Sequence, residues 1–205
     1  MYNERREEVI HLRVSKAPEV RKQEILDTAM KLFALKGYEA TSMADIAKEM
    51  NVVKGLCYRY FASKQELFDQ AINQYVVHCT EPAIRIIEDE TLSMNEKIQA
   101  IMEKMGHEEE YATYQDFFHR PENGDFHEQL TLKMCKYLSP FIKKEISRLE
   151  QIGRLKLKNA DTLIDFILYG QVHLLSGEHD QLNQNIHLIK HYMDILIQSE
   201  IIPDV

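Results

Sequence analysis

The sequence predicts an all-α fold, and three observations support that prediction. Apolar residues recur at intervals of three and four along most of the chain, which is the period of an α-helix. Only 7 Gly and 5 Pro occur in 205 residues, too few for the tight turns of many short strands. No segment alternates apolar and polar residues as a half-buried strand does, and no internal repeat is present. We therefore expect helices throughout.

The first helices are marked by caps. Residues 1–18 are charged and aperiodic, which predicts an N-terminal arm. A helix is expected from about Glu19 to Gly37, because glycine is typical of a helix C-terminal cap. Ser42 and Asp45 have the spacing of a capping box, which predicts a second helix of only about two turns.

A sharp turn and two further helices follow. Asn51 tolerates the left-handed backbone conformation that such a turn needs. A short third helix is expected to begin near Val53 or Lys54. Ser63 repeats the capping pattern, and a longer apolar stripe carries a fourth helix towards Pro82.

The remainder of the chain also has the helical period. The expected segments are a short one after Pro82, one from 94 to about 114, a break at 121–124, a long helix from about 126 to 152 that Gly153 ends, one capped by Asn159 that runs to about 175, and a last one from about 185 to 201.

Charge and cysteine content restrict the possible partners. Residues 1–80 carry 12 Lys and Arg against 11 Asp and Glu, a net charge of +1, whereas residues 81–205 carry 13 against 22, a net charge of −9. Any contact with nucleic acid is therefore expected in the first 80 residues. Three isolated cysteines, Cys57, Cys79 and Cys135, suggest neither a disulfide framework nor a thiolate metal site. We expect a cytoplasmic protein without a membrane span.

Two short helices joined by a tight turn and flanked by longer helices have the pattern of a helix-turn-helix. Such a unit places its second short helix in the major groove of DNA. Lys54, Tyr58, Arg59 and Lys64 would supply hydrogen-bond donors for phosphates and base edges.

The stretch from Arg21 to Tyr75 resembles the TetR (tetracycline repressor) family, and it covers roughly the first third of the chain. The resemblance is carried by Gly37-Tyr38, Ala40-Thr41, Ile46-Ala47, Tyr58-Arg59-Tyr60-Phe61 and Lys64-Gln65-Glu66-Leu67, in that order. Two positions depart from the family pattern: Asn51 replaces the turn glycine, and Val53 replaces a serine. Since valine cannot accept a capping hydrogen bond, helix capping is expected to weaken by about 1 kcal/mol.

The resemblance implies a DNA-binding domain at 19–80 and an effector-binding and dimerisation domain at 81–205, with the fourth helix shared between them. It assigns phosphate contacts to Thr41, Ser42 and Lys64. It places the recognition helix at Lys54, Gly55, Leu56, Tyr58, Arg59 and Tyr60. Among these, Arg59 could bond a guanine edge and Leu56 could touch a thymine methyl group.

The resemblance also implies that the last two helices pair with their copies in a homodimer. The expected interface residues are Phe166, Leu168, Val172, Leu175, Ile189, Tyr192, Met193 and Leu196. An alternative is that both apolar stripes only fill the core of the monomer.

An effector pocket is expected among the middle helices, where aromatic and Met side chains are frequent. The candidate lining residues are Met102, Met105, His107, Tyr111, Tyr114, Phe118, Met134, Tyr137, Phe166 and Tyr169. The alternative is ordinary core packing, and no particular ligand follows from the resemblance.

The sequence thus predicts a transcriptional regulator. We expect a repressor that binds a palindromic operator in double-stranded DNA and leaves it when a small-molecule effector binds. No cofactor and no catalytic residue are expected.

An all-helical metal-binding or di-iron enzyme is an alternative, but the only Glu-x-x-His is Glu8 with His11, in the arm. His187 and His191 have metal-ligand spacing, although a solvated or dimer-facing pair is the simpler interpretation. A protein-interaction module without DNA binding is a third alternative.

Overall fold

The computed structural model describes residues 16–104, 114, 117–118, 120–175 and 179–202. The described part confirms the all-α prediction: its elements are α1 Pro18–Lys36, α2 Met43–Glu49, α3 Lys54–Tyr60, α4 Lys64–Glu88, α5 Met94–Lys104, the 3₁₀ helix η1 Pro121–Asn123, α7 Gly124–Gln151, α8 Ala160–Gly170, α9 Val172–Leu175 and α10 His179–Glu200. The expected arm lies outside the described residues except at its end, as do the candidate ligand residues Met105, His107 and Tyr111.

The predicted caps of the first helices are confirmed. The amide of Asp45 donates to the Ser42 hydroxyl at 3.2 Å, and the amide of Ser42 donates to the Asp45 carboxylate at 2.9 Å, which completes a capping box. Asn51 has φ +53°, in the left-handed region, and so supplies the sharp turn between α2 and α3. Gly37 and Gly153 also have positive φ and follow the ends of α1 and α7.

Two helices in the middle of the chain extend differently from the prediction. The fourth helix does not end near Pro82 but continues through it to Glu88, because only one backbone donor is lost there while Ile86 and Ile87 remain buried beyond it. The helix expected from 159 to 175 is instead divided at Gln171 into α8 and α9, next to Gly170, which is a weak helix former.

The caps and bounds of the last helices also differ from expectation. Asn159 occupies the N-cap position of α8, but its side chain makes no capping hydrogen bond. The last helix begins at His179, earlier than the expected residue 185. Between α7 and α8, Leu157 forms an isolated antiparallel bridge with Ile201 at the end of α10.

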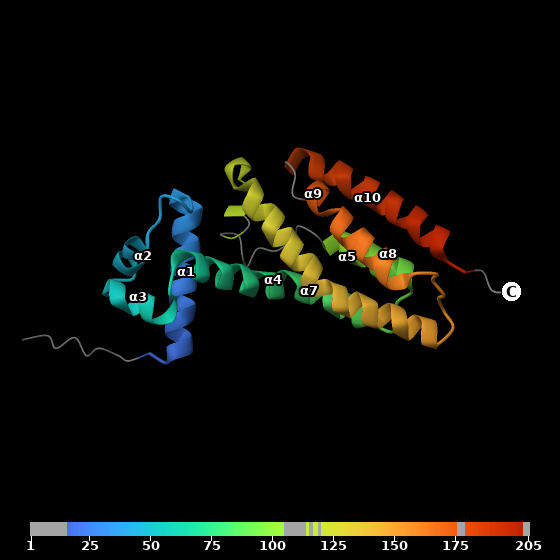
Figure 1. Cartoon of the computed structure of the whole chain (residues 1–205), viewed down its shortest axis with the longest axis horizontal. Helices are drawn as coiled ribbons and strands as arrows, with labels where there is room; N and C mark the ends of the chain where they lie inside the picture. Colours follow the sequence, from blue (N-terminus) through green and yellow to red (C-terminus); the bar gives the residue numbers. More distant parts are fainter. Residues whose placement is uncertain (1–15, 105–113, 115–116, 119, 176–178, 203–205) are drawn as a thin grey trace, which may run out of the picture.

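Figure 1 shows how α4 connects the two ends of the molecule. The helices α1, α2 and α3 form a group at one end, and α4 runs from this group beneath the C-terminal helices. Along its length α4 packs against α1, α5 and α7. The helices α8 and α9 pack against α7, and α10 packs against α8 and α9. The helix α4 therefore contacts both the N-terminal helix α1 and the later helices α5 and α7.

Two hydrophobic clusters form the described core. The first joins α1, α2, α3 and the first half of α4 to aromatic side chains of the C-terminal part, among them Phe117 and Phe118. The second lies between α7, α8 and α9, with Leu196 and Ile197 of α10 packed against it. The core of the N-terminal helices is thus completed by residues that lie far along the chain.

A buried ion group ties the far end of α4 to α5 and α7. The ammonium of Lys97 donates to the Glu145 carboxylate at 2.5 Å and to the backbone carbonyl of Ile87 at 2.6 Å. The guanidinium of Arg148 donates two further bonds to Glu145, at 2.7 and 2.8 Å. These bonds, with Arg148 first and Lys97 second, lower the pKa of the Glu145 carboxyl to about 2 against the opposing effect of burial.

Two further classes of feature were sought in the described residues. None of the helices there is both long and apolar enough to cross a membrane. Across the same residues no group of three or more His, Cys, Asp or Glu side chains is arranged to hold a metal ion.

Candidate nucleic-acid interface

The turn between α2 and α3 is held by backbone hydrogen bonds. The amide of Asn51 donates to the Lys48 carbonyl at 3.0 Å, and the amide of Val52 donates to the Ala47 carbonyl at 2.9 Å. On the inner side, Ile46 of α2 and Cys57 of α3 are completely buried. The two short helices are therefore fixed to each other and to the first core, which leaves the opposite side of α3 free.

The outer side of α3 carries the predicted donors. Lys54, Gly55, Tyr58 and Arg59 are exposed, Tyr58 to 45% of its surface. Leu56 and Tyr60 are half-buried, so they lie at the edge of this face. The structure thus brings all six predicted residues of the recognition helix onto one element, with four of them on its open side.

Cation–π contacts order the exposed side chains of α3. The ammonium of Lys54 lies 5.4 Å from the ring centroid of Tyr58, one helical turn away. The guanidinium of Arg59 lies 5.5 Å from the centroid of Tyr60. Each contact contributes about 0.5–1 kcal/mol at an exposed site, enough to restrict the cation without immobilising it.

The start of α3 lacks a side-chain cap, as predicted. Val53 has the extended backbone of an N-cap residue and is 68% exposed, but no side chain accepts from the first amides of the helix. The amide of Leu56 donates to the Val53 carbonyl at 2.9 Å, so an acceptor from outside the chain, such as a phosphate oxygen, would have to bind the two amides before it, those of Lys54 and Gly55.

The two residues predicted to bind phosphate before α2 lie differently. Ser42 is exposed, with its hydroxyl engaged by Asp45. Thr41 is only 1% exposed, and its hydroxyl donates inward to the Gly37 carbonyl at 2.9 Å. In this conformation the Thr41 side chain supports the loop, and Ser42 is the one that reaches the surface.

Lys64, the predicted phosphate ligand at the start of α4, makes contacts within the chain. Its ammonium donates to the Tyr38 carbonyl at 2.9 Å and lies 4.1 Å from the centroid of the Tyr38 ring. Tyr38 itself is buried, and its environment raises the pKa of its phenol, chiefly through desolvation and then through Glu39 and Asp69. In the sequence Tyr38 was noted only as part of a motif. Its contact with Lys64 could not be predicted there, because the two residues are 26 positions apart.

The N-terminal helices match a known family model. Residues 25–71, which include the buried side of α1, the whole α2–turn–α3 unit and the start of α4, match the model described as bacterial regulatory proteins, tetR family. The N-terminal helices of this chain are therefore similar to that family over the helix-turn-helix.

Two sequence relatives agree with the chain over a short segment. YuxN of Bacillus subtilis (strain 168), described as an HTH-type transcriptional regulator, is 51% identical over 51 residues, which are 25% of this chain and 18% of YuxN. IcaR of Staphylococcus aureus (strain Newman), described as the negative transcriptional regulator of the biofilm operon icaADBC, is 41% identical over 51 residues, which are 25% of this chain and 27% of IcaR. The matched segment therefore spans less than a third of either relative.

Solved structures extend the likeness of fold to nearly the whole chain. A TetR-family transcriptional regulator from Pectobacterium atrosepticum superposes with a TM-score of 0.62 at 16% identity, covering 93% of this chain and 100% of that one. The transcriptional regulator FadR from Bacillus subtilis, solved in complex with stearoyl-CoA, gives a TM-score of 0.53 at 17% identity, covering 85% and 97%. The C-terminal helices are thus included in the likeness of overall fold to these two structures.

The predicted effector-binding residues that the structure describes do not gather in one place. Tyr114 and Phe118 are buried in the first core, with Met134 packed against it. Phe166 and Tyr169 are exposed on α8, and Tyr137 is exposed on α7. The side chain of Met102 lies outside the described part of the structure.

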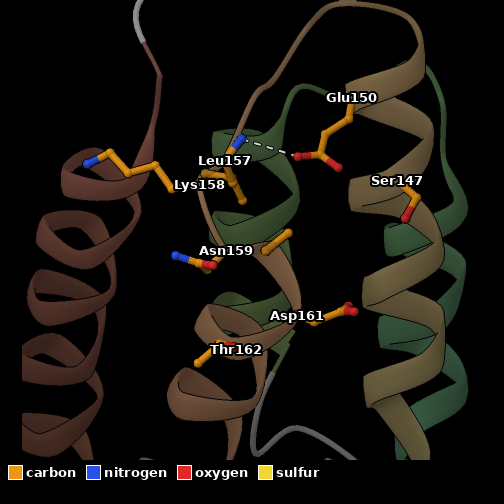
Figure 2. Close-up of a pocket in the computed structure, with 8 residues that line it drawn as sticks. Ser147, Glu150, Leu157, Lys158, Asn159, Asp161 and Thr162 are labelled. Carbon is orange, nitrogen blue, oxygen red and sulfur yellow. Dashed lines mark hydrogen bonds between the residues drawn. The ribbon is translucent and has the colours of Figure 1, made fainter.

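A cleft of about 380 Å³ opens elsewhere, between the end of α7 and the start of α8 (Figure 2). Polar side chains line most of it, including Ser147, Glu150 and Asp161, and the amide of Leu157 donates to the Glu150 carboxylate at 3.2 Å. None of the predicted effector residues lines this cleft.

The residues predicted for the dimer interface divide into two sets. Phe166 and Tyr192 are exposed to 65% and 57%. In contrast, Leu168, Val172 and Ile189 are buried in their own chain, and Leu175, Met193 and Leu196 are half-buried.

Sequence reasoning missed three exposed residues near this surface: Leu174 of α9, and Leu188 and Ile195 of α10. The positions 188, 192 and 195 follow the i, i+4, i+7 spacing of one helix face, so the signal was present. Apolar residues on the neighbouring positions of α10 concealed it.

Proposed function

We propose that this chain is a DNA-binding transcriptional regulator that binds operator DNA through α3. The observation that carries the proposal is the outer side of α3, where Lys54, Tyr58 and Arg59 are exposed on a helix whose other side is fixed in the core. A helix held in this way can enter the major groove with its cationic side towards base edges and phosphates. The family match at residues 25–71 supports the same function.

The proposal includes repression as the mode of regulation and the cytoplasm as the compartment. IcaR, which is 41% identical to this chain over 51 residues, is described as a negative regulator. A repressor acts by occupying its operator, which requires no catalytic group. A protein that binds chromosomal operators works where the chromosome lies.

The proposal also includes a homodimer formed by α8 and α10. The exposed apolar residues Phe166, Tyr169, Leu188, Tyr192 and Ile195 lie on these two neighbouring helices. Exposed apolar side chains concentrated on two adjacent helices are typical of a protein interface. Two copies related by a two-fold axis would present two α3 helices to successive major grooves.

The third part of the proposal is a small-molecule effector that binds the C-terminal helices and releases the operator. FadR, a neighbour in fold, was solved with stearoyl-CoA bound. Release requires that the effector bind the DNA-free conformation more tightly than the DNA-bound one. A saturating effector that left operator affinity unchanged at fixed salt would contradict this part.

The experiment that tests the proposal is selection of bound duplexes from a random pool with the full-length chain. We expect a palindromic site whose affinity falls steeply as salt rises, because phosphate contacts release condensed counterions. Failure to retain any duplex at low ionic strength would refute DNA binding. Recovery of non-palindromic sites only would refute the dimeric arrangement.

A further inference from the structure

Tyr38 lies where the N-terminal helices, the start of α4 and the start of α7 meet. Its ring centroid is 5.1 Å from that of Phe33 in α1 and 4.9 Å from that of Phe68 in α4. A third neighbour, Phe126, comes from the first turn of α7, with its centroid 5.2 Å away. The C-terminal part of the chain therefore touches this ring directly.

The same residue holds the beginning of α4. The Tyr38 hydroxyl donates to the Gln65 side chain at 2.9 Å, while its carbonyl accepts from the Lys64 ammonium at 2.9 Å. That carbonyl also accepts from the amide of Thr41 at 3.2 Å, one residue before the N-cap of α2. Tyr38 thus contacts both helix starts that the resemblance assigns to DNA phosphates.

The location of the Lys64 ammonium depends on the orientation of the Tyr38 ring. A cation is attracted to an aromatic ring only where it lies over the ring face, and here the ammonium is 4.1 Å from the centroid. The Lys64 side chain keeps 24% of its surface exposed, and its ammonium also lies 4.0 Å from the carboxylate of the highly exposed Glu39, so it contacts Tyr38 and still reaches solvent. A change in the tilt of the ring would therefore move a charge at the protein surface.

Phe126 is the residue of the C-terminal part through which the tilt of the Tyr38 ring can be changed. Its ring lies 5.6 Å from Phe117 and 4.9 Å from Phe68, within the same aromatic cluster. A shift of the first turn of α7 would alter the packing of the Tyr38 ring without any movement of α3.

We propose that Tyr38 is a positioning residue that links α7 to the DNA-facing start of α4. The contact with Phe126 sets the orientation of the Tyr38 ring, and the ring and carbonyl of Tyr38 set the location of the Lys64 ammonium. The C-terminal helices would thereby tune one phosphate contact. This effect on DNA rests on the proposed function, whereas the link between Phe126 and Lys64 does not.

The link itself is tested by acylation of lysine amines in the full-length chain, with the modification rate of each lysine read by mass spectrometry. We expect Phe126→Leu to raise the rate at Lys64 about three- to tenfold, the factor that corresponds to loss of a cation–π contact. The rate at Lys54, an exposed lysine of α3, should not change. Phe126→Met, which keeps most of the side-chain volume, should act in the same direction.

The matched control is Phe118→Leu, since the buried Phe118 ring lies against Phe68, Phe117 and Tyr75. It should lower the melting temperature and leave the Lys64 rate unchanged. Equal acceleration at Lys64 in both variants, or no acceleration with Phe126→Leu and Phe126→Met, would overturn the proposal.

The functional consequence is tested by a double-mutant cycle on the selected duplex. We expect Phe126→Leu to weaken binding about three- to tenfold when Lys64 is present and to have no effect in the Lys64→Met background. If Phe126→Leu weakened binding by the same factor in the presence of Lys64 and in the Lys64→Met background, the link to DNA would be overturned. If the unsubstituted chain binds no duplex, the proposed function fails, and the acylation rates still decide whether Phe126 controls Lys64.

Discussion

At the scale of single residues, the proposed function gives the two cations of α3 different tasks. Lys54 stands at the first position of the helix, where the uncapped amides also favour an anion. Arg59 lies one and a half turns further on, with its planar guanidinium near the Tyr60 ring. A point charge suits a phosphate, whereas the guanidinium matches the two acceptors of a guanine edge.

Lys54→Ala and Arg59→Ala are therefore expected to separate affinity from specificity. Lys54→Ala should weaken all duplexes about equally and reduce the slope of log affinity against log salt by about 1. Arg59→Ala should cost about 1–3 kcal/mol on the selected site and relax the preference at one base pair of each half-site. Titrations of the selected duplex and of its single-base variants at several salt concentrations measure both effects. If both variants lost affinity equally for all duplexes, the assignment of different roles to Lys54 and Arg59 would be contradicted.

Val53 offers a prediction about stability. The residue has N-cap geometry without an accepting side chain, so Val53→Ser should add one hydrogen bond to the first turn of α3 and raise the free energy of unfolding by about 1 kcal/mol. Urea unfolding of the full-length chain measures this gain. Val53→Ala, which adds no acceptor, is the control; an equal gain there would show that capping is not the cause.

At the scale of elements, the buried ion group explains how α4, α5 and α7 are held together. Lys97 and Glu145 are both buried, and the Lys97 ammonium also bonds the carbonyl of Ile87 near the end of α4. Removal of one partner from such a group leaves the other charge unpaired in a poorly solvated place, which typically costs about 3–5 kcal/mol. The group therefore fixes the far end of α4.

Glu145 makes the stability of this region depend on pH. Its folded-state pKa of about 2 lies below the ordinary value of 4.5, so the ionised carboxylate stabilises the fold fully above pH 4.5. That contribution is lost as pH falls from 4.5 towards 2. Glu145→Gln should lower the melting temperature at pH 6 and flatten its decline between pH 5 and pH 3. Thermal unfolding across this range checks the prediction, with exposed Glu88→Gln as the control that should keep the decline.

The sequence predicted best those features that depend on local interactions. Ser42, Asp45, Asn51 and Ser63 mark turns and caps through bonds to residues a few positions away, and the structure has helix boundaries at these places. The continuation of α4 past Pro82 depends instead on packing against α5 and α7. Propensity alone could not predict it.

The C-terminal assignments were harder for a related reason. Lys97 and Glu145 are 48 residues apart, and each appears on its own helix as an ordinary charged residue. Likewise, helical period groups Leu168 with Phe166, although one is buried in its own chain and the other is exposed. Only the positions of neighbouring helices distinguish core from interface on a helix that is apolar on most sides.

At the scale of the whole molecule, the proposed dimer depends on the exposed residues of α8 and α10. Phe166 and Tyr192 are the most exposed aromatic side chains on these helices. In the proposed dimer both would be covered by the partner, so a charge introduced there would be buried without a counterion.

The variant Phe166→Glu with Tyr192→Glu is therefore expected to sediment at the monomer mass of 24.1 kDa, whereas the unsubstituted chain sediments at twice that mass. Its affinity for the palindromic duplex should fall to that for a half-site. Tyr137→Glu, at an exposed position of α7, is the control and should remain dimeric. Dimers formed by the doubly substituted chain would place the interface elsewhere.

Pro82 has a mechanical consequence for such an assembly. It removes one backbone donor from α4 at a point between the N-terminal helices and the ion group at Lys97. A helix bends most easily where a hydrogen bond is missing. Bending of α4 would then be concentrated at Pro82 in each protomer. The angle of that bend, repeated by the two-fold axis, would set the distance between the two DNA-binding units.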